Sequence, residues 1–326
     1  MSDSVSPIVQ AEQEQIDEFI EYLAQKGRDA GWQKLAREIL PRYLQDEGTA
    51  HTRSFCAQHI AGQDDAYRSI AIHFWYANFR GDHTSATYLL TMLGTTDVLE
   101  SQKARLAELY GISQAEEVFG GLDVPALGSD LSLYPEMIDL YLHKLRSTLD
   151  EESCRKVLAG NHHQLDPEQF AGEKQHFKDA PSIEEFLRSK HERLVDNLAQ
   201  HAATGKLWFE QRITDRVVDY VRRHQEIQTG VLQGKRLIVD KIPYDPDSWL
   251  GESDPDKKRY LACHCPFVRE SIPAGTKVPS LWCYCTGGFT KLLWDYIYER
   301  PLEVELLSSV LDGSSRCRFA ITLPTS

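Results

Sequence analysis

The sequence predicts an α+β protein, with a helical N-terminal half followed by a C-terminal domain in which helices pack on an antiparallel sheet. Two observations support this class. Apolar residues recur at helical spacing through roughly the first 230 residues, and short β-rich runs bounded by Gly, Pro and Asp follow Gly234. A chain of 326 residues can form two cores. We therefore expect an all-helical domain over residues 1–150 and a cysteine-rich α+β domain over residues 151–326.

Helices are expected throughout the first domain. An apolar stripe at helical spacing marks the first of them: Ile16, Phe19, Ile20 and Leu23. The next helix reaches Pro41, which is expected to kink or end it. Another helix begins near Asp97, with Glu100 three residues later as in a capping box, and Gly111 is expected to end it.

The middle of the chain, residues 151–235, is also expected to be helical. Ser182 and Glu185 have the spacing of a capping box at the start of an amphipathic helix. The segment 213–234 is ambiguous because it combines helical periodicity with several β-branched residues.

Strands are expected in the C-terminal region at residues 235–245, 258–268 and 279–287, where β-rich runs are bounded by turn residues. A helix should follow over residues 287–300. Two more strands, joined by the Gly-containing hairpin "LDGSSR", should complete an antiparallel sheet.

Composition and charge limit the possible partners. Hydrophobic residues make up 41% of the chain and charged residues 26%, which is ordinary for a globular protein. The net charge of −13 disfavours nucleic acid and anionic membrane surfaces as partners. The N-terminus does not have the pattern of a signal peptide, and no apolar run is long enough for a membrane span. We expect a cytoplasmic protein that acts on or binds a small molecule, and a homodimer is left open.

Cysteines cluster near the C-terminal end. Five of the seven lie after residue 262: Cys263, Cys265, Cys283, Cys285 and Cys317. In a reducing compartment, thiols, metal ligands or catalytic groups are expected rather than structural disulfides. If the two Cys-x-Cys runs are paired strands, each pair of sulfurs projects from one face, and four sulfurs could bind zinc. The spacing differs from the Cys-x2-Cys knuckles of zinc ribbons. Inert, buried thiols are the third interpretation, and we expect that state for Cys56.

A catalytic use of the cluster would need a nucleophile and a proton-transfer partner. Cys283 or Cys285 is the preferred nucleophile, because amides at the start of the following helix would lower the thiol pKa. His264 or Glu305 would transfer the proton. His264 should nevertheless face away from its neighbouring cysteines, and Glu303 and Glu305 share a strand face that either meets solvent or lines a pocket.

Other candidates are less specific. His162 and His163 follow Cys154 in "CRKVLAGNHH" and either contribute to the site or lie in an exposed loop. The dense aromatic residues of 282–298 form core or line a small apolar pocket. The chain contains no Walker loop, Gly-x-Gly-x-x-Gly, Gly-x-Ser-x-Gly or His-Glu-x-x-His motif. We therefore expect no nucleotide cofactor.

The segment 260–324 resembles the C-terminal half of proteins grouped as aminothiazoline-carboxylate hydrolase-like. It is also similar, more distantly, to the 4-vinyl reductase domain, a small-molecule-binding α+β module with a Cys-rich zinc site. The resemblance covers at most a third of the chain. The matching positions are Cys265-Pro266-Phe267, Cys283 or Cys285, Gly313, Cys317 and Phe319.

The resemblance implies one of two functions. The first is a hydrolase that opens a C=N or amide-like bond in a small heterocycle or amino-acid derivative, through a Cys thiolate or a metal-bound water. The second is a non-catalytic sensor or carrier that binds a small ligand beside a structural metal–thiolate site. The zinc site it implies uses a Glu, here Glu303 or Glu305, but Ser308 and Ser309 stand where a further Cys is expected. The metal ligands expected here, for zinc with iron not excluded, are Cys263, Cys265, Cys283, Cys285 and Cys317.

Overall fold

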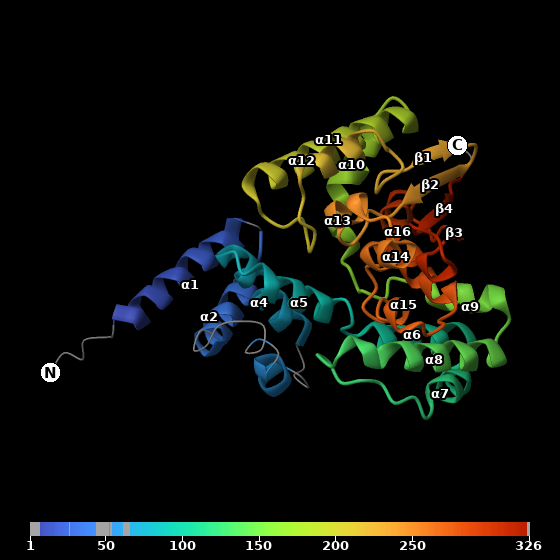
Figure 1. Cartoon of the computed structure of the whole chain (residues 1–326), viewed down its shortest axis with the longest axis horizontal. Helices are drawn as coiled ribbons and strands as arrows, with labels where there is room; N and C mark the ends of the chain where they lie inside the picture. Colours follow the sequence, from blue (N-terminus) through green and yellow to red (C-terminus); the bar gives the residue numbers. More distant parts are fainter. Residues whose placement is uncertain (1–6, 26, 44–51, 53, 61–65, 325–326) are drawn as a thin grey trace. The chain divides into compact units, whose positions relative to one another are not determined.

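The structure is a computed structural model that describes residues 7–25, 27–43, 52, 54–60 and 66–324. It confirms the α+β class. Helices occur throughout the described residues, and a four-stranded antiparallel sheet lies in the C-terminal part (Figure 1).

The chain divides into two compact units. Unit 1 comprises residues 1–96 with 126–129, and unit 2 comprises residues 97–125 and 130–326. The division therefore lies near residue 96, not near 150. The reason is that side chains from the helices after residue 97, such as Leu106 and Leu142, share one hydrophobic core with the C-terminal Trp282 and Val310.

Unit 1 is helical over the residues that the structure describes. Its elements are α1 (Pro7–Gln25), α2 (Ala30–Tyr43), the π-helical turn η1 (Cys56–Ile60), α4 (Ala66–Arg80) and α5 (His83–Leu93). The apolar stripe of the first helix is buried as predicted. Pro41 lies inside α2, in its last turn, where the helix ends two residues later. Cys56 is buried, as expected, and burial raises the pKa of its thiol to about 12.

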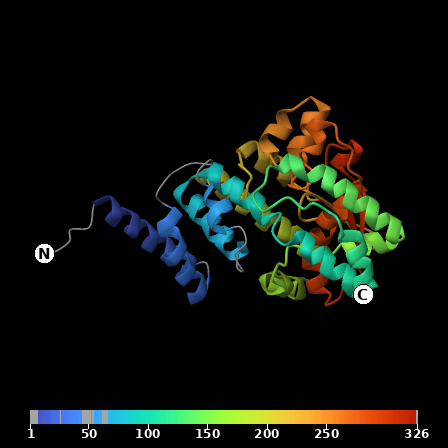
Figure 2. The same ribbon diagram turned by 90° about the horizontal axis from the view of Figure 1, so that it is seen from below.

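Unit 2 contains the remaining helices: α6 (Val98–Tyr110), α7 (Ile112–Phe119), α8 (Tyr134–Thr148), α9 (Glu151–Leu158), α10 (Ala171–Asp179), α11 (Ile183–Thr204), α12 (Asp215–Arg222), α13 (Pro246–Gly251), α14 (Pro255–Ala262), α15 (Ser271–Ala274) and α16 (Tyr284–Ile297). Short 3₁₀ turns are η2 (Leu131–Leu133), η3 (Pro167–Phe170), η4 (Ser280–Cys283) and η5 (Val310–Asp312). Helices α8 and α9, coloured green, lie beside the red C-terminal segment (Figure 2).

Capping explains several helix starts. The Ser182 side chain accepts a hydrogen bond from the Glu185 N–H, as the capping-box spacing predicts. The predicted box at Asp97 does not form. Asp97 adopts a left-handed conformation, with φ of +56°, and its side chain caps no N–H. Gly111 ends α6 as predicted.

The sheet consists of β1 (Val231–Gln233), β2 (Arg236–Asp240), β3 (Val304–Ser308) and β4 (Arg318–Thr322), in the order β1-β2-β4-β3. All neighbours are antiparallel, and a register shift between Leu306 and Ser308 interrupts the β3–β4 ladder. Trp294 of α16 shares a core with Val239 of β2 and Ile321 of β4. The helix therefore covers one face of the sheet.

Two predicted strands are wrong. Residues 258–268 begin inside α14 and continue as a loop, and residues 279–287 form η4 and the first turn of α16. The start of α14 is determined by its cap, because the Asp254 side chain accepts the Lys257 N–H at 2.9 Å and Pro255 occupies the first turn. The two Cys-x-Cys runs are therefore not paired strands.

Candidate functional site

The five C-terminal cysteines lie close together but do not form a metal site. The thiol of Cys263 interacts electrostatically with Cys265 and Cys317, and also with Cys283. Across the described ranges, no three His, Cys, Asp or Glu side chains are placed to bind one metal ion together. The paired strands expected to align these sulfurs for zinc or iron are absent from the described residues. The ligands concerned are Cys263, Cys265, Cys283, Cys285 and Cys317.

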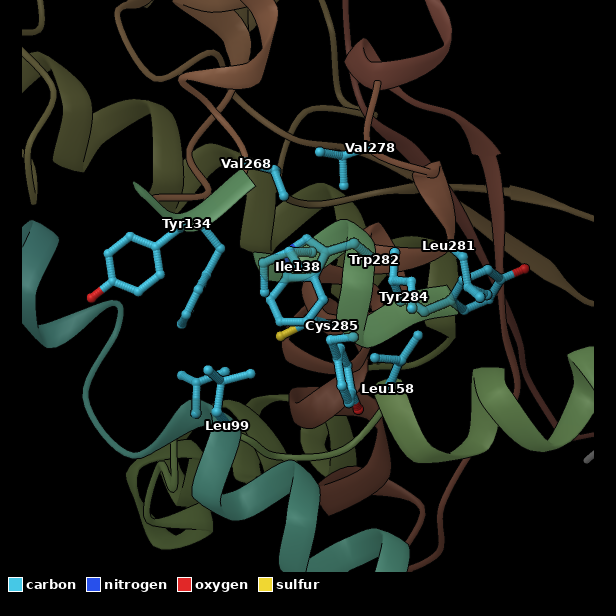
Figure 3. Close-up of a cluster of buried hydrophobic side chains, with 14 of the residues drawn as sticks. Leu99, Tyr134, Ile138, Leu158, Val268, Val278, Leu281, Trp282, Tyr284 and Cys285 are labelled. Atoms are coloured by element: carbon cyan, nitrogen blue, oxygen red, sulfur yellow. The ribbon is translucent and has the colours of Figure 1, made fainter. Parts of the chain in front are cut away.

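Cys285 is a buried, protonated thiol. It lies in the first turn of α16, only 6% exposed, among apolar side chains that include Ile138, Leu158 and Trp282 (Figure 3). Burial raises its pKa far above that of an ordinary thiol. Desolvation therefore outweighs the effect of the helix N-terminus, and the predicted activation of this thiol is not found.

Cys263 and Cys265 also keep their protons. Burial raises the pKa of Cys263 well above the ordinary value and that of Cys265 to about 11. The Trp282 indole donates a hydrogen bond to the Cys265 sulfur at 3.1 Å. These thiols pack in the core rather than carry charge.

Cys317 differs from the other cysteines of the cluster. The thiol of Cys283 forms a hydrogen bond with Cys317, and this contact lowers the pKa of Cys317 while it raises the pKa of Cys283. The opposite directions of the two shifts make Cys283 the donor and Cys317 the acceptor of this contact. The predicted nucleophile positions, Cys283 and Cys285, are therefore both protonated.

Further polar groups surround the thiol pair. The Ser309 hydroxyl lies 3.2 Å from the Cys283 sulfur and also hydrogen-bonds Cys317. The Val310 N–H donates to Cys317, and Lys241 adds positive charge beside it. Ser309 is completely buried. It occupies the position at which the sequence resemblance expects a cysteine, and it supplies a hydroxyl there instead of a thiolate.

The sheet register explains why Lys241 and Cys317 are neighbours. Asp240 pairs with Arg318 at the end of the β2–β4 ladder. One residue beyond this pair, the Lys241 N–H donates a hydrogen bond to the Cys317 carbonyl oxygen at 3.0 Å. Alternate residues share a face, so Cys317 lies on the side of Phe319. The Phe319 ring packs at Gly287, in the first turn of α16, close to Cys283.

The backbone at Cys317 is fixed from both sides. Asp240 is fully buried, and it accepts hydrogen bonds from Arg318 at 2.5 and 2.9 Å. Arg316 forms a second ion pair with the same carboxylate, at 3.1 Å. Both sequence neighbours of Cys317 therefore bind one carboxylate of β2.

His264 does not reach the thiol pair. One ring nitrogen, Nδ1, lies 2.8 Å from a Glu210 carboxylate oxygen, and Nε2 lies 2.5 Å from the Ile242 carbonyl oxygen. Burial raises the pKa of Glu210, but the hydrogen bond and charge of His264 outweigh that effect and the net shift is downward. Both ring nitrogens are thus engaged, so the predicted proton-transfer role of His264 is not supported.

Glu305 lies away from the site. Its side chain is 59% exposed and pairs with Arg236 across the sheet. Glu303 is exposed as well. The two carboxylates face solvent, which leaves neither as a partner of the thiols.

The two histidines of the "NHH" run have different surroundings. His162 is buried, with Nε2 2.9 Å from the Val157 carbonyl oxygen. His163 packs edge-to-face on Phe289, at 5.5 Å between ring centroids, and Lys241 lies over the same ring at 5.1 Å. Burial lowers the pKa of both rings to about 4, so both are neutral at pH 7.

Sequence reasoning missed Lys241 and Glu210. Burial lowers the pKa of Lys241, while the charges of Glu210 and Cys317 oppose that shift. Lys241 follows an apolar strand without any motif, and Glu210 lies in a short turn far away in sequence. Only the long-range register brings Lys241 beside a cysteine.

Comparison with known proteins gives one partial match. Residues 255–326, about a fifth of the chain, match the model of a family of unknown function, DUF6144. No curated protein and no solved structure matches the chain. In the described part of the chain, every helix is too short or too polar to cross a bilayer.

Proposed function

We propose that the protein is a small-molecule hydrolase in which the Cys317 thiolate attacks a C=N or amide-like carbon of a heterocycle or amino-acid derivative. The observation that carries the proposal is the set of donors around Cys317: the Cys283 thiol, the Ser309 hydroxyl and the Val310 N–H. A thiolate, not a thiol, is the effective nucleophile. The choice of a carbon–nitrogen bond rests on the sequence resemblance of residues 260–324.

The thiol pair also supplies a proton. In the proposed reaction with an amide-like substrate, the Cys317 sulfur bonds to the carbon and the C–N bond breaks. The leaving nitrogen takes the proton of Cys283, which leaves a thioester on Cys317. Water then adds to the thioester carbon and returns a proton to Cys283, and the C–S bond breaks to restore the Cys317 thiolate. No metal ion takes part in this sequence of steps.

A covalent probe tests the nucleophile without a guessed substrate. A small heteroaryl nitrile adds to a thiolate and raises the protein mass by one molecule of nitrile. We expect a single adduct on Cys317 at pH 7, located by peptide mass spectrometry, and no adduct in Cys317→Ser. With thiazolines, cyclic amidines and small amides as substrates, Cys317→Ser should lower turnover on the order of 10³-fold or more.

Cys285→Ala is the matched control, because Cys285 lies in the same region but keeps its proton. It should label and turn over like the original protein, with circular dichroism confirming that both variants are folded. Labelling at Cys283 or Cys285 in place of Cys317, or unchanged turnover in Cys317→Ser, would refute the proposal.

A further inference from the structure

The side chain of Arg269 contacts two aromatic rings. Its guanidinium carbon lies over the Tyr244 ring at 3.8 Å from the ring centroid, and over the Tyr260 ring at 4.1 Å. At these distances the flat face of a guanidinium meets the face of a ring. The five N–H donors of the group lie in its plane, so stacking does not use them. The two rings therefore fix the orientation of the guanidinium and leave its donor edge available.

Backbone hydrogen bonds hold the segments that carry these three side chains. The Arg269 N–H donates to the Cys265 carbonyl oxygen at 3.0 Å, which closes a turn. The Asp245 N–H, directly after the first tyrosine, donates at 2.9 Å to the carbonyl oxygen of Leu261, directly after the second. The stack therefore belongs to the fixed frame of the C-terminal region.

Arg269 carries a positive charge that no protein carboxylate neutralises. It is half-buried, and no Asp or Glu of the described residues forms an ion pair with it. The neighbouring carboxylates bond elsewhere, because Glu270 accepts the Tyr260 hydroxyl at 3.0 Å and Asp245 accepts the Ser248 N–H at 3.2 Å. The Nε atom of Arg269 is buried without a hydrogen-bond partner. A buried donor and an unpaired charge in one side chain indicate that an acceptor from outside the chain completes its contacts.

We propose that Arg269 anchors a binding site for an oxyanion, the carboxylate or phosphate ester group of a small organic ligand. A guanidinium whose plane is fixed donates two parallel hydrogen bonds to two oxygens of such a group. The two tyrosine rings border the guanidinium, so an aromatic acid gains apolar contact as well. The site requires neither the Cys317 thiolate nor hydrolysis, so it stands apart from the proposed reaction.

The competing interpretation is a purely structural stack that packs α14 on the loop after β2. In that case an anion has no preference for Arg269 over another exposed arginine. Arg223 serves as the comparison, because it is exposed at the end of α12 and its Nε donates to the Asp219 carbonyl oxygen at 3.0 Å. Replacing either arginine by Gln removes the same charge from the protein.

Calorimetric titration of the full-length, reduced protein tests the site with three probes: benzoate, phenyl phosphate and the neutral benzamide. We expect one molecule of at least one anion to bind, and benzamide to bind at least about tenfold more weakly. Arg269→Gln should weaken binding of that anion about 10- to 100-fold, the value of hydrogen bonds to a charged group, and Arg223→Gln should leave it unchanged. The tighter anion identifies the ligand group as a carboxylate or a phosphate ester.

A second measurement needs no variant and therefore does not depend on whether Arg269→Gln folds. Phenylglyoxal modifies accessible arginines, and peptide mass spectrometry gives the rate at each position. The tighter anion at saturation should protect Arg269 and leave the rate at Arg223 unchanged, and benzamide should protect neither. The proposal is overturned by equal binding of anion and amide, by no binding of either anion, or by an unprotected or unreactive Arg269.

Discussion

Cys285 and Cys317 differ because of what surrounds each sulfur. Both are near a helical turn, and the sequence predicts thiolate character for Cys285 from its place before "TGG". In the structure, Cys285 is surrounded by apolar side chains and its pKa rises, while Cys317 meets a thiol, a hydroxyl and a backbone N–H and its pKa falls. Burial and hydrogen bonding depend on contacts between distant residues, so sequence spacing alone cannot tell which of these thiols has the lowered pKa.

The protonation of Cys317 can be tested by the pH dependence of alkylation. Because its pKa lies below that of an ordinary thiol, its thiolate fraction should rise with pH through a correspondingly lower midpoint. In Cys283→Ala the hydrogen bond is lost, so the midpoint should move upward. A hydrogen bond to a charged group is worth about 1.5–3 kcal/mol, which corresponds to about 10- to 100-fold slower alkylation at neutral pH.

The measurement is the rate of iodoacetamide addition to Cys317, followed by peptide mass spectrometry from pH 5 to pH 10. Cys265→Ala is the control. The hydrogen bond from Cys283 contributes most to the lowered pKa of Cys317, so loss of the Cys265 thiol should leave that pKa unchanged. Equal pH midpoints of Cys317 alkylation in the original protein and in Cys283→Ala would show that the Cys283 hydrogen bond does not lower the pKa of Cys317.

At the scale of elements, strands and the last helix of the C-terminal region can be predicted from the sequence. The structure of the runs around Cys263 and Cys283 cannot. The strands at 236–240 and 304–308 and the helix 284–297 follow from local patterns. The runs around Cys263 and Cys283 look like alternating strands, yet Asp254 and Pro255 start a helix at 255. The helix cap therefore determines the structure at the start of this run more strongly than the strand-like alternation of its residues.

The glycines of "CYCTGG" are explained by packing. A Cβ at Gly288 would lie 2.5 Å from the Gly160 carbonyl oxygen and 2.6 Å from the Ala159 carbonyl carbon, at the end of α9. Both atoms belong to the backbone and cannot rotate away. Gly288→Ala should therefore lower the free energy of unfolding by about 1–3 kcal/mol.

Urea denaturation of the reduced protein measures this change. Gly172→Ala in α10 is the matched control, because a Cβ there meets nothing within 4 Å. It should leave the stability unchanged or raise it by up to about 1 kcal/mol. A Gly288→Ala variant as stable as the control would mean that α16 and α9 are farther apart than described.

At the scale of the whole molecule, the chain divides into two compact units, and their boundary does not follow from composition. Helical periodicity continues past residue 150, so the sequence gives no sign that the helices after residue 97 join the C-terminal core. Which helices share a core is decided by tertiary packing, not by helix propensity.

The division predicts that residues 97–326 fold without residues 7–96. The buried residues of the three hydrophobic cores in unit 2 all come from positions after 96. A fragment of residues 97–326 should retain helical circular dichroism and a cooperative thermal transition within a few degrees of the corresponding transition in the full chain. A fragment that melts without cooperativity or binds hydrophobic dyes would contradict the independence of unit 2.

The strand order also has a consequence for synthesis of the chain. β4 lies between β2 and β3, but it is translated after both. While a ribosome is still making the chain, β2 lacks the strand that pairs with its inner edge, and Cys283 lacks Cys317. The N-terminal helices can form early from local contacts, whereas the sheet must wait for residues 318–322. Any reactivity that depends on the thiol pair is therefore acquired only after the central strand has emerged, because a nascent chain that ends before Cys317 carries Cys283 without its partner.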